Sequence, residues 1–122
     1  MLLTLSLPRI NEYMTTAVVE AIYATEGAAL APGAKLLDLS VDLSKSIPHD
    51  CPPISHFRLA LRERVWLRRL VVAPADELDV GAPLGLFSTA PDEPLDGDPS
   101  RALRVTVAGI VFRPDWWSDA AP

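Results

Sequence analysis

The chain has 122 residues, 49% of them hydrophobic and 22% charged, which is typical of one folded domain rather than of a disordered segment. Its formal net charge of -5 argues against general nucleic-acid binding, because that affinity depends largely on basic residues that neutralise phosphates. No apolar run reaches the roughly 20 residues of a membrane span, and the N-terminal residues lack the pattern of a signal peptide. We therefore expect a cytoplasmic protein that binds neither membrane nor nucleic acid.

Alternation of apolar and polar residues predicts a series of strands along the chain. The first is typical: Leu3, Leu5 and Leu7 alternate with small polar residues, which is the pattern of a strand with one buried face. No stretch has the period of an amphipathic helix. The predicted strands are, in chain order, residues 3–7, 17–24, 37–41, 57–61, 65–72, 84–88 and 103–108. The sequence thus predicts an all-β fold.

Two segments between these strands are predicted to lack regular structure. Residues 43–56 contain three prolines and no periodicity, and we interpret them as an enlarged loop. Residues 91–100 are rich in proline and acidic side chains, and we interpret them as a linker. The predicted organisation is a β domain over residues 1–90, the linker, and a C-terminal strand and tail over residues 101–122 that pack on the domain or on a partner.

The two halves of the predicted domain resemble each other. Gly33 and Gly81 are 48 residues apart, and the same spacing separates Leu36 from Leu84. It also relates Leu30 to Leu78, Ala28 to Asp76 and Leu39 to Phe87. Such self-similarity predicts two equivalent β-motifs packed about a pseudo-two-fold axis.

Four motifs stand out in these halves, namely Met14–Glu20 (MTTAVVE), Glu26-Gly27 with Pro32-Gly33, Leu36–Leu39 (LLDL) and Val80–Leu84 (VGAPL). By these motifs the chain resembles the lipoyl/biotinyl carrier domains over residues 3–42 and 65–88. The resemblance implies a flattened barrel-sandwich of two four-stranded antiparallel sheets. To this fold the present chain would add a longer loop at the hairpin tip and an extra C-terminal strand.

The chain departs from these domains at the residue that would carry the cofactor. In them a lysine at the hairpin tip bears lipoate or biotin, whereas here Asp42 is followed by Leu43, which cannot form the amide. We therefore expect no cofactor and a non-catalytic interaction or assembly module. The alternative is a carrier in which Lys45, two residues later, bears lipoate or biotin and shuttles groups between enzymes.

The same loop suggests a further hypothesis. It holds His49, Cys51 and His56, residue types that ligate transition metals or take part in thiol catalysis. Cys51 is the single cysteine of the chain, so an internal disulfide is excluded and a cysteine-rich zinc pattern is absent. A small metal- or thiol-dependent protein is thus a third reading, and otherwise these side chains are incidental members of a loop.

Two features suggest a protein partner. Five of the eleven basic residues lie between Arg58 and Arg69, and a continuous strand register would place four of them on one face with a tryptophan. The second feature is a pair of consecutive tryptophans near the C-terminus, which are typical of interface anchors and suggest a homodimer formed through the tail. The partner is expected to be a lipoyl- or biotin-dependent enzyme. The candidate partner-binding residues are Arg58, Arg62, Arg64, Trp66, Trp116 and Trp117, with Arg68 on the same predicted face.

Overall fold

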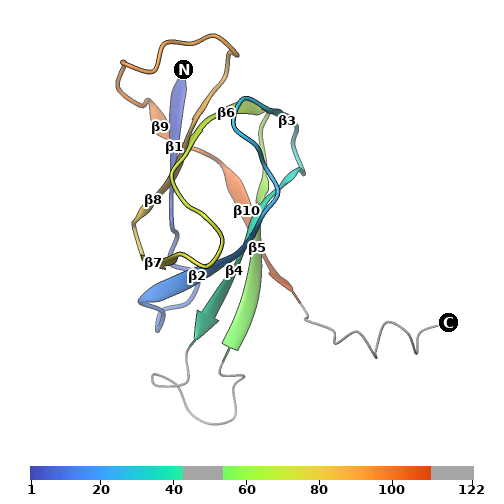
Figure 1. Ribbon diagram of the computed structural model, residues 1–122, viewed down its shortest axis with the longest axis vertical. Helices are drawn as coiled ribbons and strands as arrows, with labels where there is room; N and C mark the ends of the chain where they lie inside the picture. The colour runs from blue at the N-terminus through green and yellow to red at the C-terminus, as the bar shows by residue number, and fades with distance from the viewer. Residues whose placement is uncertain (43–53, 111–122) are drawn as a thin grey trace, which may run out of the picture.

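The structure is a computed structural model that describes residues 1–42 and 54–110, and in these residues the regular elements are ten β-strands (Figure 1). The strands are β1 (Leu2–Ser6), β2 (Thr16–Ile22), β3 (Ala29–Leu30), β4 (Lys35–Asp42), β5 (Ile54–Leu61), β6 (Val65–Leu70), β7 (Glu77–Asp79), β8 (Pro83–Ser88), β9 (Arg101–Ala102) and β10 (Val105–Ile110). The predicted all-β fold class is confirmed.

The strands form two five-stranded sheets. Sheet A has the order β3-β6-β8-β1-β9, and sheet B has the order β10-β5-β4-β2-β7. The prediction of two four-stranded sheets in a flattened barrel is therefore corrected, because each sheet has five strands and the sheets do not close into a barrel. The fifth strand of each sheet comes from the end of the chain, since β9 pairs with β1 and β10 pairs with β5. The predicted extra C-terminal strand is present as β10.

The predicted internal repeat is confirmed by main-chain hydrogen bonds that recur at the same spacing. Gly27 N donates to Leu67 O at 2.7 Å, and Ala75 N, 48 residues later, donates to Val19 O at 2.7 Å. The repeats exchange their short strands, because β3 pairs with β6 while β7 pairs with β2. Each repeat therefore completes the sheet of the other. Further matched bonds are Tyr23 N to Leu36 O with Val71 N to Leu84 O, and Ala34 N to Ala31 O with Ala82 N to Asp79 O.

The turns of the two repeats share an unusual backbone conformation. Gly33 and Gly81 have φ angles of 88° and 91°, a region that glycine reaches without the steric cost of a Cβ atom. Gly27 has φ 88°, and the matching position of the second repeat is Ala75, with φ 76°. The second repeat thus makes the same turn with an alanine.

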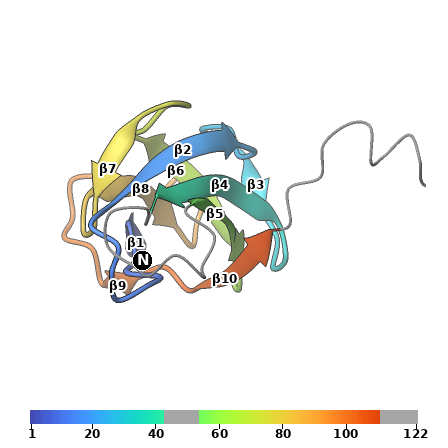
Figure 2. The ribbon, with the colours of Figure 1, turned by 90° about the horizontal axis from the view of Figure 1, so that it is seen from below.

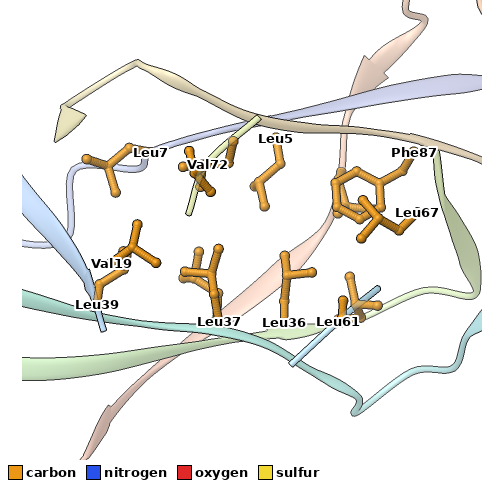
Figure 3. Close-up of a cluster of buried hydrophobic side chains, with 14 of the residues drawn as sticks. Leu5, Leu7, Val19, Leu36, Leu37, Leu39, Leu61, Leu67, Val72 and Phe87 are labelled. Carbon is orange, nitrogen blue, oxygen red and sulfur yellow. The ribbon is translucent and has the colours of Figure 1, made fainter. Parts of the chain in front are cut away.

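The core lies between the facing sides of the two sheets (Figure 3). Leu5, Leu67 and Phe87 point inward from sheet A, and Leu37 and Leu39 meet them from sheet B (Figure 3). This is the outcome that the alternation predicts, because every second side chain of a strand points to the same face. Fully buried large side chains include Leu3, Leu7, Met14, Leu36, Leu59, Leu61 and Leu84.

The predicted loop over residues 43–56 is shorter than expected at its C-terminal end. Residues 54–56 belong to β5 and pair with β4, with Ile54 opposite Asp42 and His56 opposite Ser40. Ladder pairing thus extends the β4–β5 hairpin into a segment whose composition suggested a loop, because cross-strand hydrogen bonds outweigh local preference there. The remaining residues of the connection, 43–53, lie outside the described residues.

The acidic segment between β8 and β9 lies against the outer side of sheet A. Arg68 Nη1 donates to the main-chain oxygen of Glu93 at 2.7 Å and to Ser88 Oγ at 3.2 Å. The N-terminal ammonium group of Met1 forms an ion pair with the Glu93 carboxylate, and Ser100 N donates to Leu2 O at 2.8 Å. These contacts hold the segment that connects β8 with β9, two strands of sheet A, against that sheet.

Within residues 1–42 and 54–110, no helix has the length and apolar character of a membrane-spanning segment.

Candidate interaction surfaces

Four arginines and one glutamate gather where the β5–β6 turn meets the link between β9 and β10. The turn carries Arg62, Glu63 and Arg64, and the link ends at Arg104. Arg62 N donates to Arg104 O at 3.1 Å, and Arg104 N donates to Glu63 Oε2 at 2.9 Å. With Arg101 of β9, these five residues form what we call the arginine cluster.

Glu63 is the anion that organises the arginine cluster. Arg101 donates from Nη2 to Oε1 at 2.6 Å and from Nη1 to Oε2 at 2.8 Å, so the two groups form a bidentate pair. These bonds lower the pKa of Glu63 to about 2, and the Arg104 main-chain N–H adds to the effect. Both carboxylate oxygens of Glu63 are thus hydrogen-bonded, to the Arg101 side chain and to the Arg104 main-chain N–H.

The other three arginines of the cluster extend into solvent. Arg62, Arg64 and Arg104 are exposed, and their side chains make no ion pair with any residue that the structure describes. The buried side chain of Leu103 and its main-chain bond to Thr4 O, at 2.8 Å, fix the link that carries Arg104. The cluster is thus a basic site whose main chain is held in place, although the chain as a whole has a net negative charge.

The Glu63 pair predicts a specific pH dependence of stability. Because its pKa falls from 4.5 to about 2 on folding, Glu63 contributes its full stabilisation above pH 4.5 and loses it as the pH falls toward 2. We expect Glu63→Gln to lower the free energy of unfolding by about 1–2 kcal/mol at neutral pH, and by progressively less in that acidic range. Urea unfolding of both proteins across the range measures this.

Asp92→Asn is the control, because Asp92 is exposed and takes part in no ion pair with the described residues. If the difference in the free energy of unfolding between the wild type and Glu63→Gln stayed constant down to pH 2, the lowered pKa of Glu63 would be contradicted.

A second polar group, the tyrosine cluster, lies on the outer face of sheet B and consists of Tyr23, Lys35, Asp38 and Arg58. Arg58 donates to both oxygens of Asp38, from Nε at 2.8 Å and from Nη2 at 3.1 Å. The Tyr23 hydroxyl donates to Asp38 Oδ2 at 2.6 Å. The cations of Lys35 and Arg58 lie 5.6 Å and 5.4 Å from the centre of the Tyr23 ring, within cation–π range.

The hydrogen bonds of the tyrosine cluster fix its protonation states. The Arg58 guanidinium lowers the pKa of Asp38, and the hydrogen bond to the Asp38 carboxylate raises the pKa of Tyr23. The cluster therefore holds a carboxylate, a guanidinium and a neutral phenol at neutral pH. With the Asp38 charge balanced by Arg58, we see no candidate general base in this arrangement.

The predicted basic face is divided between the two sheets. Arg58 lies on β5 of sheet B, whereas Trp66 and Arg68 lie on β6 of sheet A. The expected single face is wrong because the chain turns at residues 62–64 and crosses from one sheet to the other. The apolar residues of these two strands were expected to face the core, and this is correct, since they are all buried: Leu59, Leu61, Val65 and Leu67.

Several predicted site residues lie outside the described residues, namely Lys45, His49, Cys51, Trp116 and Trp117. His56 is described and lies in β5. Among residues 1–42 and 54–110, no group of three or more histidine, cysteine, aspartate or glutamate side chains is placed to hold a metal ion.

Sequence reasoning overlooked part of both clusters. Asp38 and Arg58 are 20 residues apart, and only the β4–β5 register places them opposite each other. Arg101 and Arg104 are about forty residues from Glu63, and no local pattern connects them. The run of basic residues from Arg58 to Arg69 was the signal that the sequence offered, and it includes Arg58 of the tyrosine cluster and Arg62 and Arg64 of the arginine cluster.

Comparisons with protein-family models, with curated proteins and with solved structures find no match to this chain.

Proposed function

We propose that this protein is a non-catalytic interaction module whose arginine cluster docks an acidic surface of a protein partner. The observation that carries the proposal is the exposure of Arg62, Arg64 and Arg104 around a glutamate that Arg101 already neutralises. Guanidinium groups bind carboxylates through paired hydrogen bonds, which gives both affinity and orientation. Complementary charge across an interface also speeds association and excludes wrong partners.

The protein's own acidic segment does not occupy this site through ion pairs. In the part of the chain that the structure describes, the carboxylates of residues 91–100 form one ion pair, between Glu93 and the N-terminus. Arg68 reaches the main chain of Glu93 rather than its carboxylate. Among residues 1–42 and 54–110, no carboxylate forms an ion pair with the three exposed arginines, which supports a role in binding an external anion.

The module is, in our proposal, a divergent lipoyl/biotinyl-like domain without the usual cofactor. The exchanged short strands of the two repeats support this, as does the turn geometry that recurs every 48 residues. Leucine at position 43 removes the amine that the cofactor needs, so the fold would serve for recognition alone. The partner we propose is an enzyme that handles lipoyl or biotinyl carriers.

The binding proposal is tested with a synthetic oligoglutamate peptide as the acidic probe, titrated at low and moderate salt. We expect Arg62→Gln with Arg64→Gln to weaken binding about ten-fold, a loss of ~1.4 kcal/mol that two partly exposed charge pairs can supply. Arg9→Gln with Arg69→Gln makes the same change in net charge at exposed positions outside both clusters and should have little effect. Equal weakening by both double variants would reject the cluster as the site, and binding unaffected by salt would reject the ionic mechanism.

The carrier function is the second candidate. The pairing of Asp42 with Ile54 brings both ends of the connection that contains Lys45 to the end of the β4–β5 hairpin. This is the position at which the resembled carrier domains present their lysine. Intact mass and peptide mapping of protein purified from its native host test it, and lipoate or biotin on Lys45 would replace the interaction module as the proposal.

A further inference from the structure

The four sheet edges differ sharply in length and charge. Sheet A ends in β3 and β9, each of two residues, and sheet B ends at one side in β7, three residues that include Glu77 and Asp79. Short or charged edge strands discourage pairing with another chain. The fourth edge, β10, has six residues with the sequence VTVAGI, and it contains neither a charge nor a proline. Figure 2 shows β10 beside β5 at the margin of sheet B.

The main-chain groups on the open side of β10 follow from its register with β5. Arg62 N donates to Arg104 O, so residue 104 directs its main-chain groups toward β5. Successive residues of a strand direct these groups to opposite sides, and residues 106, 108 and 110 therefore also bond toward β5. Val105, Val107 and Gly109 direct their N–H and C=O groups away from it, and no described strand pairs with them.

We propose that β10 pairs in the antiparallel sense with β10 of a second copy, with Val107 opposite the second copy's Val107. A two-fold axis requires that a residue pair with its own counterpart. Centring on Val107 makes hydrogen-bonded pairs of residues 107 with 107 and of 105 with 109, which uses the outward groups of all three residues. The two copies would then share one continuous ten-stranded sheet.

The side chains of β10 suit a second copy of the same strand. In this register Val107 lies opposite Val107 of the second copy. Val105 lies opposite the second copy's Gly109, and Thr106 opposite its Ala108, so no like charges face each other. Val107 is 39% exposed although it lies in the row of the buried Leu59, and its counterpart would cover it. A strand with no charge contributes no repulsion to self-pairing. The edge begins next to Arg104 of the arginine cluster, but the pairing uses none of the cluster's side chains, and the two proposals are tested by separate measurements.

The first test is oxidative crosslinking of the full chain carrying Val107→Cys with Cys51→Ser, which leaves one cysteine. A hydrogen-bonded antiparallel pair separates its Cα atoms by about 5.5 Å, within the range that a disulfide spans. We expect a crosslinked species of twice the 13.2 kDa chain mass. Thr106→Cys in the same background is the matched control, because its two copies would lie about 8 Å apart, beyond disulfide reach. Crosslinking of both variants alike, or of neither, would overturn the register.

The second test uses sedimentation equilibrium. We expect the wild-type chain to reach twice its monomer mass as concentration rises, and Val107→Pro to raise the dissociation constant at least about ten-fold. Proline is tolerated on an edge strand where the N–H group faces solvent, so the fold should persist, as circular dichroism would show. Val107→Ala keeps the main-chain donor and should still dimerise. A wild-type monomer at every concentration would overturn the proposal, and so would a dimer unaffected by Val107→Pro, which would place the contact elsewhere.

Discussion

Replacement of Phe87 by alanine should lower the free energy of unfolding by about 3–5 kcal/mol, the range for a large aromatic removed from a packed core. Phe87 is 1% exposed and lies on β8, the middle strand of sheet A. It is paired with Leu3 on one side and Leu67 on the other, and its ring extends toward sheet B (Figure 3). No neighbouring strand can move inward to fill the space without breaking a ladder.

Urea unfolding, followed by circular dichroism, measures this loss. The neighbouring residue supplies the control, because Leu86 points to the outer face of the same strand and is only partly buried. Leu86→Ala should cost less than half as much as Phe87→Ala. Similar losses at both positions would mean that strand β8 as a whole, rather than the inner face, limits stability.

The long strands were predictable because burial imposes a period that the sequence must follow. Leu37, Leu39 and Val41 alternate with more polar residues, and all three are buried in β4. The short strands were not predictable in this way, since β3 and β9 have two residues each and two residues have no period. They form because a neighbouring long strand offers partners for their main-chain groups.

The internal repeat was visible in the sequence, but its consequence for the topology was not. Equal spacing of Gly33 and Gly81 indicates equal turns, and the φ angles agree. Spacing alone does not say whether a short strand pairs within its own repeat or with the other one. That choice depends on the packing of two layers around one core, which is a property of the whole chain.

Only the part of the candidate site that lies within one short stretch of the sequence was predictable. Arg62 and Arg64 stood out by charge density, and both belong to the arginine cluster. Their assignment to one face with Arg58 was wrong, because a turn of three residues is enough to move the chain to the other sheet. Arg101 and Arg104 enter the cluster through β9 and β10, whose pairing partners are distant in sequence.

Gly85 and Phe87 form a pair that departs from the repeat, and the departure predicts a second large effect. Their counterparts 48 residues earlier are Leu37 and Leu39, so the second repeat replaces two leucines by a very small and a very large residue. A Cβ atom on Gly85 would lie 3.3 Å from Phe87 Cε1 and 3.0 Å from the main-chain oxygen of Arg69. Both contacts are tighter than ordinary van der Waals contact, so the carbonyl and the aromatic ring crowd a side chain at position 85.

We therefore expect Gly85→Ala to destabilise the protein by about 1–3 kcal/mol, the usual cost of overpacking. The direction of this change in stability is informative. Replacing glycine by alanine normally stabilises a protein by roughly 0.4–1 kcal/mol, because it lowers the conformational entropy of the unfolded chain. Introducing the same change into Phe87→Leu, which copies the first repeat, should cost less because the ring no longer blocks the site. The contact with the Arg69 carbonyl remains in both backgrounds, so Phe87→Leu should remove only part of the stability cost of Gly85→Ala.

A double-mutant cycle of Gly85→Ala and Phe87→Leu, measured by urea unfolding, isolates the contact between them. A coupling of about 0.5–3 kcal/mol is the range for residues in direct contact, and its sign should favour the double variant over the sum of the single changes. Additive effects would assign the cost to the β6 main chain at Arg69 rather than to the ring. In that case the size of Phe87 would not explain why the second repeat has glycine where the first has leucine.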